Sequence, residues 1–133
     1  MQKLYGDYNK TLEYYFNNLE TNLAMARTYN DIGLVYNKQA DYNKALEFHF
    51  KSLEIQKKTI GENNPAIDYT YNNIGSVYKE LGDYNKALEY YFNNLETNLA
   101  MACTYNDIGL VYNKQGDYNK ALEFHFKSLE IQK

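Results

Sequence analysis

The side chains best suited to catalysis or metal binding are few and widely separated in this sequence. The two histidines, His49 and His125, lie 76 residues apart, and Cys103 is the single cysteine. Each histidine falls on an apolar stripe of helical spacing, so we interpret both as hydrogen-bonded core residues rather than metal ligands. No histidine lies near Cys103 in the sequence, which favours a passive thiol over an activated nucleophile.

Phosphate binding and acid–base catalysis have no sequence motif here either. The glycines, such as Gly33 and Gly82, fall within or between helical patterns instead of in a Gly-rich loop after a strand. Aspartate and glutamate occur as helix caps and surface charges without a catalytic pairing. We therefore predict that the protein is not an enzyme, has no catalytic residues and uses no cofactor or metal.

Composition and charge argue against several further classes of protein. The chain has 133 residues, of which 44% are hydrophobic, and its net charge is −3 with both signs interspersed. Without a basic run, nucleic acid and anionic membranes are poor partners. No segment approaches the ~20 apolar residues of a membrane span, and the first residues lack a signal-peptide pattern. A lone cysteine fits a reducing compartment, so we expect a cytoplasmic protein.

The strongest signal in the sequence is internal repetition. Residues 7–57 and 83–133 are the same 51-residue text with three exceptions. The exceptions are Thr11 against Ala87, Arg27 against Cys103, and Ala40 against Gly116. A shorter motif starts at Tyr29, Tyr71 and Tyr105, with spacings of 42 and 34 residues. Periods of this size indicate one small structural unit stacked several times, which offers an extended surface rather than one irregular site.

Each unit has the pattern of two helices joined by a tight turn. In the first helix, apolar residues recur at i, i+3, i+4 and i+7, as on one face of a helix. In the first unit these residues are Tyr29, Ile32, Gly33 and Tyr36. Asp41 then suits the N-cap of a second helix. The position before this cap holds Ala40, Gly82 or Gly116, and glycine there accepts a left-handed backbone. The unit is therefore predicted to be an αα-hairpin.

One glycine recurs inside the first helix of every unit. An interior glycine costs about 1 kcal/mol relative to alanine, so its recurrence needs a packing reason. We expect a close approach of the second helix, where small alanines also recur in register. The glycines are Gly33, Gly75 and Gly109, and the alanines are Ala45, Ala87 and Ala121.

This pattern resembles the tetratricopeptide repeat. In the second unit it is carried by Tyr71, Ile74, Gly75, Tyr78, Gly82, Tyr84, Ala87 and Tyr91. The 42-residue spacing, with Asn64 and Pro65 as the expected start of a helix, is similar to the kinesin-light-chain type of repeat. The resemblance covers essentially the whole chain. It implies an all-α fold, a right-handed α-solenoid of antiparallel helix pairs.

The sequence predicts about seven helices in a single array over residues 1–133. Residues 3–20 match the turn and second helix of a unit whose first helix is missing, as expected for a piece of a longer array. The expected helices are 8–22, 26–39, 42–59, 66–81, 84–97, 100–115 and 118–131. The expected units are a half repeat at 1–25 and repeats at 26–65, 66–99 and 100–133.

The first helices of tetratricopeptide arrays line a concave groove that binds peptides, and the resemblance implies the same role for one set of residues here. The set is Arg27, Asn30, Asp31, Leu34, Lys38, Tyr69, Asn72, Asn73, Ser76, Glu80, Cys103, Asn106, Asp107, Leu110 and Lys114. Three of them are asparagines in register, and an amide both donates and accepts hydrogen bonds. The alternative is that the set is merely the solvated face of each helix. We predict a non-catalytic scaffold that binds a peptide or protein segment.

The alternative function is self-assembly into end-to-end or exchanged oligomers. The near-identical copies can replace each other's contacts, and both ends of the array carry apolar stripes. The expected assembly residues are Tyr8, Leu12, Tyr15 and Leu19 at one end and Leu122, Phe126 and Leu129 at the other. Aromatic residues also flank the second helices, either as part of a wider core or as an exposed ridge. They are Phe16, Phe48, Phe50, Tyr90, Phe92 and Phe126.

Overall fold

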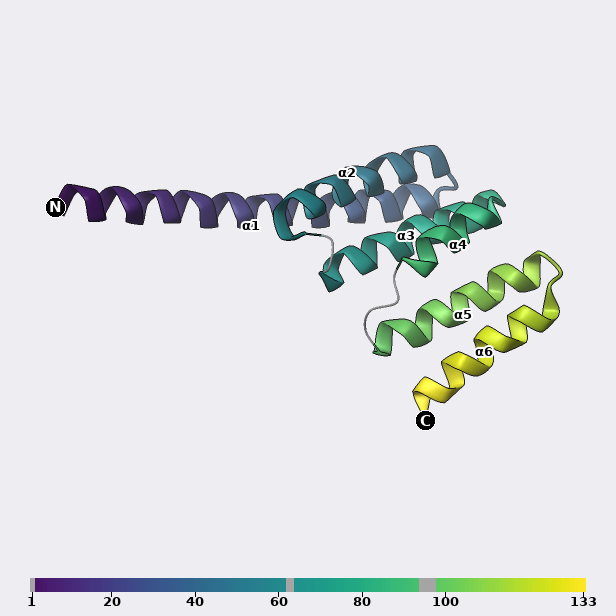
Figure 1. Ribbon diagram of the computed structural model, residues 1–133. Helices are drawn as coiled ribbons and strands as arrows, with labels where there is room; N and C mark the ends of the chain where they lie inside the picture. Colours follow the sequence, from purple (N-terminus) through teal and green to yellow (C-terminus); the bar gives the residue numbers. More distant parts are fainter. Residues whose placement is uncertain (1, 62–63, 94–97) are drawn as a thin grey trace.

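The computed structural model describes the backbone of residues 2–61, 64–93 and 98–133, with the side chains of all these residues except 2–9, 11, 12, 14–16 and 98–100. Across these ranges the chain forms six α-helices and no strand. The helices are α1 (Gln2–Lys38), α2 (Tyr42–Ile60), α3 (Pro65–Leu81), α4 (Tyr84–Phe92), α5 (Asn98–Lys114) and α6 (Tyr118–Gln132). Figure 1 shows antiparallel helix pairs stacked in a row. The predicted all-α solenoid is confirmed.

The turns between paired helices follow the predicted capping chemistry. The N-cap aspartates Asp41, Asp83 and Asp117 each accept a hydrogen bond from the backbone N–H three residues later, at 3.3–3.4 Å. The residue before each cap has a positive φ of 61° at Ala40 and 82° at Gly82 and Gly116. These contacts satisfy backbone groups that a helix end leaves free, so each pair closes with a short turn.

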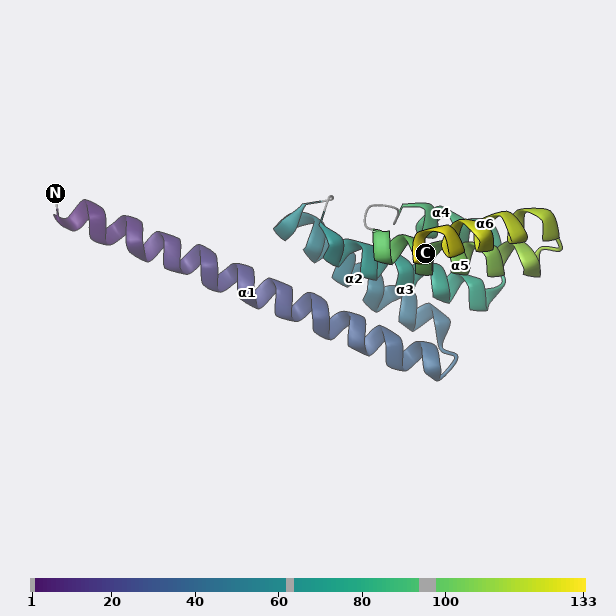
Figure 2. The same ribbon diagram turned by 90° about the horizontal axis from the view of Figure 1, so that it is seen from below.

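The N-terminal region differs from the prediction of seven helices. The expected helices 8–22 and 26–39 are joined in the continuous helix α1, which gives six helices over the described ranges. Residues 17–27 contain neither glycine nor proline, so nothing in them forces a helix to end. Figure 2 shows the N-terminal part of α1 extending away from the other helices. The predicted unit boundary after residue 25 falls inside α1, and the division into units stays a prediction.

The core forms between successive helix pairs. One buried cluster joins Leu53 of α2 to Ile67 and Ile74 of α3. A second cluster joins α4, α5 and α6 through Ala87, Leu88, Tyr91, Ile108, Val111 and Phe124. Burial of apolar surface is therefore shared between neighbouring units, as expected for a solenoid whose single units cannot bury a core alone. Within the described ranges, no helix combines the length and the apolar character needed to cross a bilayer.

The recurrent tyrosines make the same ring stack in every helix pair. The stacked pairs are Tyr36 with Phe48, Tyr78 with Tyr90, and Tyr112 with Phe124, each with ring centroids 5.6 Å apart. The Lys44, Lys86 and Lys120 ammonium groups lie 5.3–5.4 Å from the centroids of the tyrosine rings. These stacked aromatic residues thus widen the core within each pair, whereas Phe92 and Phe126 are exposed.

The recurrent helix glycines make room for rings of the second helix, which approaches closely as predicted; contact with the alanines stays a prediction. A Cβ atom built on Gly33 would lie 2.7 Å from the ring of His49, and one on Gly75 would lie 2.7 Å from the ring of Tyr91. Gly109 has the same relation to His125, at 2.8 Å. The ring lies directly on the helix backbone, so any side chain at the glycine would have to displace it.

Candidate interaction surface

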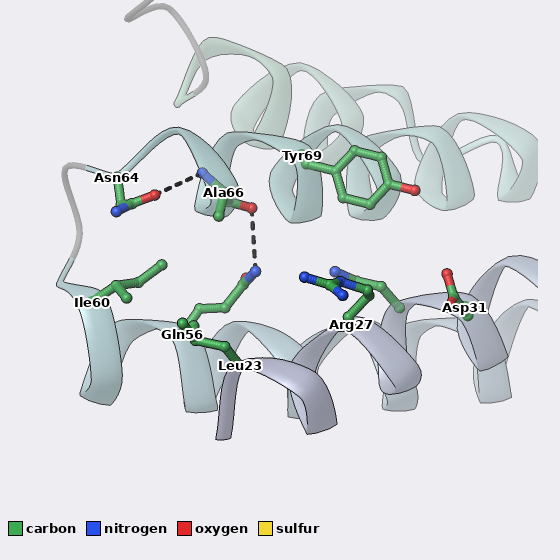
Figure 3. Close-up of a pocket in the computed structure, with 9 residues that line it drawn as sticks. Leu23, Arg27, Asp31, Gln56, Ile60, Asn64, Ala66 and Tyr69 are labelled. Atoms are coloured by element: carbon green, nitrogen blue, oxygen red, sulfur yellow. Dashed lines mark hydrogen bonds between the residues drawn. The ribbon is translucent and has the colours of Figure 1, made fainter. Parts of the chain in front are cut away.

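A hollow of about 590 Å³ opens where α1, the C-terminal end of α2 and the N-terminal turns of α3 meet (Figure 3). Its lining residues are Leu23, Arg27, Asn30, Asp31, Gln56, Ile60, Asn64, Ala66 and Tyr69. Asn64 caps α3 by accepting a hydrogen bond from the Ala66 N–H at 3.0 Å, which fixes the first turn of that helix at the edge of the hollow.

The hollow offers an aromatic ring, a cation and an anion to a ligand. Figure 3 shows Tyr69 of α3 on the side of the hollow opposite Arg27 and Asp31 of α1. The Tyr69 side chain is 52% exposed, and Arg27 and Asp31 are also exposed. Leu23 and Ile60 add apolar surface to the lining. Such a combination suits a segment that carries both an apolar side chain and a charged or hydrogen-bonding group.

Four residues of the predicted groove line this hollow, namely Arg27, Asn30, Asp31 and Tyr69. Five further lining residues were not predicted from the sequence, namely Leu23, Gln56, Ile60, Asn64 and Ala66. The last four lie between the C-terminal end of α2 and the first turn of α3, in the part of the chain that lengthens one repeat spacing from 34 to 42 residues. The longer spacing was therefore the available signal, because extra chain between two helices must cover or create some surface.

Asn30 does not present its amide to the groove as predicted, because it is buried in a polar network. Its side chain is 2% exposed. His49 Nδ1–H donates to Asn30 Oδ1 at 2.9 Å, and Asn30 Nδ2 donates to Thr70 Oγ1 at 2.9 Å. Thr70 in turn donates to Gln56 Oε1 at 2.6 Å, and Gln56 Nε2 donates to the Ala66 carbonyl at 3.2 Å. The network joins α1, α2 and α3, so Asn30 contributes to packing.

The other two asparagines occupy equivalent positions in α3 and α5. Thr104 of α5 donates to Asn72 Oδ1 of α3 at 3.5 Å. His125 Nδ1 lies 3.1 Å from Asn106 Oδ1. Asn72 thus lies where the first helix of the next unit brings a threonine, as Thr70 does for Asn30. We call the two contacts Asn30–Thr70 and Asn72–Thr104 the Asn–Thr ladder, which runs between units instead of along an open groove.

His49 is held neutral inside this network. Burial lowers the pKa of its imidazole from 6.5 to about 4. Nδ1 carries the hydrogen bond to Asn30, while Nε2 is buried without a hydrogen-bond partner among the described residues. Protonation would place a second N–H donor, and a charge, where nothing accepts it. The prediction of a hydrogen-bonded core histidine is confirmed for His49.

The remaining predicted groove residues lie along the same helices outside this hollow. Ser76 and Tyr91 hydrogen-bond through their hydroxyl groups at 3.0 Å. Burial raises the pKa of the Asp107 carboxyl, and the Lys79 ammonium opposes that shift. Among the others, Leu34, Asn72, Asn73 and Asn106 are half-buried, and Lys38, Glu80, Cys103, Leu110 and Lys114 are exposed. Their role in binding stays a prediction.

The predicted assembly residues can be placed only in part. Tyr8, Leu12 and Tyr15 lie outside the described side chains. Leu19 on α1 is exposed, as are Leu122, Phe126 and Leu129 on α6. Both ends of the stack therefore present apolar side chains to solvent.

Sequence comparison assigns the chain to a family. Tetratricopeptide repeat models match residues 24–91 and residues 102–133. The chain belongs to the tetratricopeptide repeat family, whose repeats generally mediate protein–protein interactions. The narrower likeness to the kinesin-light-chain type stays a prediction. No curated protein matches the sequence.

A solved structure gives the same fold. The crystal structure of BtubC (BKLC) from P. vanneervenii superposes with a TM-score of 0.76 at 20% sequence identity. The match covers 96% of this chain and 57% of that one, so this chain spans little more than half of that protein's length. At this identity the likeness supports the solenoid fold alone.

Proposed function

We propose that this chain is a non-catalytic interaction module that binds an extended segment of a partner protein in the hollow between α1 and α3. The observation that carries the proposal is the exposed Tyr69 ring facing the Arg27 guanidinium across that hollow. Tyrosine and arginine are, with tryptophan, the side chains enriched among residues that dominate binding energy at protein interfaces.

The lining predicts the chemistry of the bound segment. An apolar side chain of the partner would pack on Tyr69 and Ile60, and an acidic group would pair with Arg27. Asp31, exposed beside it, suits a backbone N–H or a basic group of the same segment. The buried Asn30 network behind the hollow holds the two helices in place, so the walls are preformed before a ligand arrives.

The test begins with peptides selected from a displayed random library against the immobilised chain. Their affinity is then measured by fluorescence anisotropy. Tyr69→Ala should weaken binding by roughly tenfold or more. Tyr118→Ala is the matched control, because Tyr118 is a 64% exposed tyrosine on α6 that does not line the hollow.

A second substitution uses the repetition of the chain. Arg27→Cys converts the position to the residue that the other copy carries at Cys103. It should reduce affinity for acidic peptides most and leave the fold unchanged, because the side chain is exposed. If Tyr69→Ala and Tyr118→Ala bind selected peptides equally well, the hollow is not the binding site.

Self-association is a second candidate function, and the ends of the stack favour it. Val35 on α1 is 54% exposed, whereas its counterpart Val111 in the other copy is fully buried. Leu129 on α6 is 46% exposed, whereas its counterpart Leu53 is 6% exposed. The same residues are therefore core in one copy and exposed apolar surface in the other, and exposed apolar surface of this kind suits contact with another protein.

The setting and the excluded partners follow from composition. We infer a cytoplasmic location from the single cysteine, and neither nucleic acid nor a membrane surface as a partner from the net charge of −3. A catalytic role is also not proposed, because the one buried histidine is committed to a structural hydrogen bond.

A further inference from the structure

At each end of the stack, one residue in an Asn–Thr ladder position has no ladder contact from a neighbouring unit. Thr28 of α1 occupies the position of Thr70 and Thr104, but its hydroxyl donates to its own helix at the Ala24 carbonyl, at 3.0 Å. Asn106 of α5 occupies the position of Asn30, yet within the described chain no helix follows α6 to bring it a threonine. One end of the ladder thus lacks an asparagine and the other lacks a threonine.

The apolar contacts around the ladder are incomplete in the same way. On α2, Leu46, Phe50 and Leu53 pack in the cluster that Ile67 and Ile74 of α3 complete. The counterparts of the first three on α6 are Leu122, Phe126 and Leu129, which are 54%, 61% and 46% exposed. They surround a hollow of about 270 Å³ that Asn106 and Gln132 also line. We call these five residues the C-terminal seat. It reproduces the surface of the first copy on which α3 lies.

The other end of the stack presents the surface that such a seat receives. In α5, Thr104 joins the ladder, and Ile108 and Val111 pack against Ala87 and Leu88 of α4. The counterparts on α1 are Thr28, Ile32 and Val35, which we call the N-terminal face. Val35 is more than half exposed there, because no described helix occupies the position that α4 takes on α5.

We propose that the C-terminal seat of one molecule binds the N-terminal face of a second copy of this chain, with Asn106 and Thr28 completing a rung of the ladder across the junction. The inference deepens the self-association candidate and rests on it. A second copy fits because its N-terminal face carries Thr28 and, one helical turn later, Ile32. Helices α3 and α5 present a threonine and an isoleucine to the preceding unit at the same spacing. The contact joins unlike surfaces, so it repeats head to tail.

The continuous helix α1 is what leaves the N-terminal face open. In the second copy, the residues equivalent to 12–16 are Leu88–Phe92 of α4, and they lie against α5. A chain that folded back at residues 17–23 would cover Val35 with its own segment and exclude the second molecule. Because α1 runs unbroken from Gln2 to Lys38, its N-terminal part extends past the stack instead (Figures 1 and 2).

The test uses two variants that each block one surface. Val35→Glu blocks the N-terminal face, and Phe126→Glu blocks the C-terminal seat. Both residues are exposed in the single molecule, so circular dichroism should show an unchanged fold. In sedimentation velocity experiments the unaltered chain should form species beyond the dimer as concentration rises. Each variant alone should stay monomeric, and an equimolar mixture should form a dimer that grows no further, since only one intact junction remains.

The rung itself is tested by a double-mutant cycle on the same mixture. Thr28→Val and Asn106→Leu should each raise the dissociation constant of the junction roughly three- to tenfold. The two substitutions together should raise it no more than either one alone. Additive losses would show that the two side chains do not meet, and would overturn the register.

Two other outcomes separate the parts of the inference. A monomeric unaltered chain at high micromolar concentration would end the self-association candidate and this junction together. An unaltered chain that assembles while Val35→Glu and Phe126→Glu assemble equally well would keep self-association and overturn the proposed surfaces. Neither result would bear on peptide binding in the hollow between α1 and α3.

Discussion

Residues 12–26 and 88–102 are the same fifteen residues, yet they take two different structures in this molecule. In the first copy they lie within one continuous helix, α1. In the second copy α4 ends at Phe92 and α5 begins at Asn98. The two stretches cannot differ in intrinsic helix propensity, so their surroundings must decide between a straight helix and a helix pair.

The surroundings of the second copy are visible in its contacts. The Tyr91 ring lies on Gly75, and its hydroxyl hydrogen-bonds with Ser76 of α3 at 3.0 Å. At the other end of α4, Asn85 Oδ1 accepts a hydrogen bond from Nε2 of Gln115, the residue just after α5, at 3.4 Å. These contacts hold α4 antiparallel to its neighbours on both sides. In the described chain no helix precedes residues 8–22 to hold them likewise, so a continuous α1 gives up only the contacts that these residues would make by folding back on α1 itself.

The largest expected effect comes from filling the glycine in the middle of the stack. Gly75→Leu should destabilise the protein by about 3 kcal/mol or more, because the new side chain must displace the buried Tyr91 ring. Gly109→Leu should cost less, since His125 at the end of the stack is half-exposed and its ring can move outward. Urea denaturation followed by circular dichroism compares the two. Equal losses would mean that the end unit is packed as tightly as the middle one.

The next effect is a dependence of stability on pH that His49 causes. Its folded-state pKa of about 4 lies below the unfolded value of 6.5, so the unfolded chain takes up a proton first as pH falls. The contribution of neutral His49 to the free energy of unfolding is therefore complete above pH 6.5. It is lost progressively as the pH falls toward 4, by about 3 kcal/mol in all.

The matched control for this pH dependence copies a pair that the chain already uses. Leu34→Ser with His49→Tyr reproduces Ser76 and Tyr91, the corresponding residues of α3 and α4. Melting temperatures measured between neutral pH and the acid limb should fall less steeply for this variant than for the unaltered chain. Identical slopes would show that another group titrates.

A smaller effect is expected from the threonines of the ladder. Thr70→Val should cost about 1–3 kcal/mol, because it leaves Asn30 Nδ2 and Gln56 Oε1 buried without their partner. Thr28→Val should be nearly neutral in the monomer, since Thr28 is exposed and bonds only its own helix. Denaturation at low concentration measures both. A comparable cost at Thr28 would place that residue in an internal contact.

The smallest difference compares two valines of the same repeat position. Val111→Ala removes two buried carbon atoms and should lower the free energy of unfolding by about 1–2 kcal/mol. Val35→Ala should stay within about 0.5 kcal/mol, because more than half of its surface is already exposed. Equal losses in dilute protein would indicate that residues 8–22 fold back onto α1 in solution.

The sequence was sufficient for those parts of the fold that a single helix pair determines. The predicted helices 42–59, 66–81 and 118–131 agree with α2, α3 and α6 to within one residue at each end. Aspartate caps, positive-φ turns and a 3.6-residue periodicity are local properties, and they recur in every unit. The length of α1 and the end of α4 depend on the neighbouring helix, and identical local sequences cannot report that difference.

The candidate site was predictable to the extent that exposure follows from periodicity. Arg27, Asp31 and Tyr69 are exposed as expected and line one hollow. Asn30 has the polar character of a surface residue, but α3 of the next unit covers it and supplies Thr70. Gln56 was missed for the same reason, because a polar residue that is buried by a neighbouring unit has no signature in its own helix.

The contrast between the two copies is tested most directly by a pair of distances. Spin labels at Lys10 and Lys38, on a Cys103→Arg background, should lie about 42 Å apart if α1 is continuous, at about 1.5 Å per residue. Labels at the equivalent positions Lys86 and Lys114 should be separated by only about 10 Å between neighbouring helix axes. Pulsed dipolar spectroscopy, with continuous-wave broadening for the short pair, measures both. A long first distance and a short second one are the predicted result, and a short distance for both pairs would contradict it.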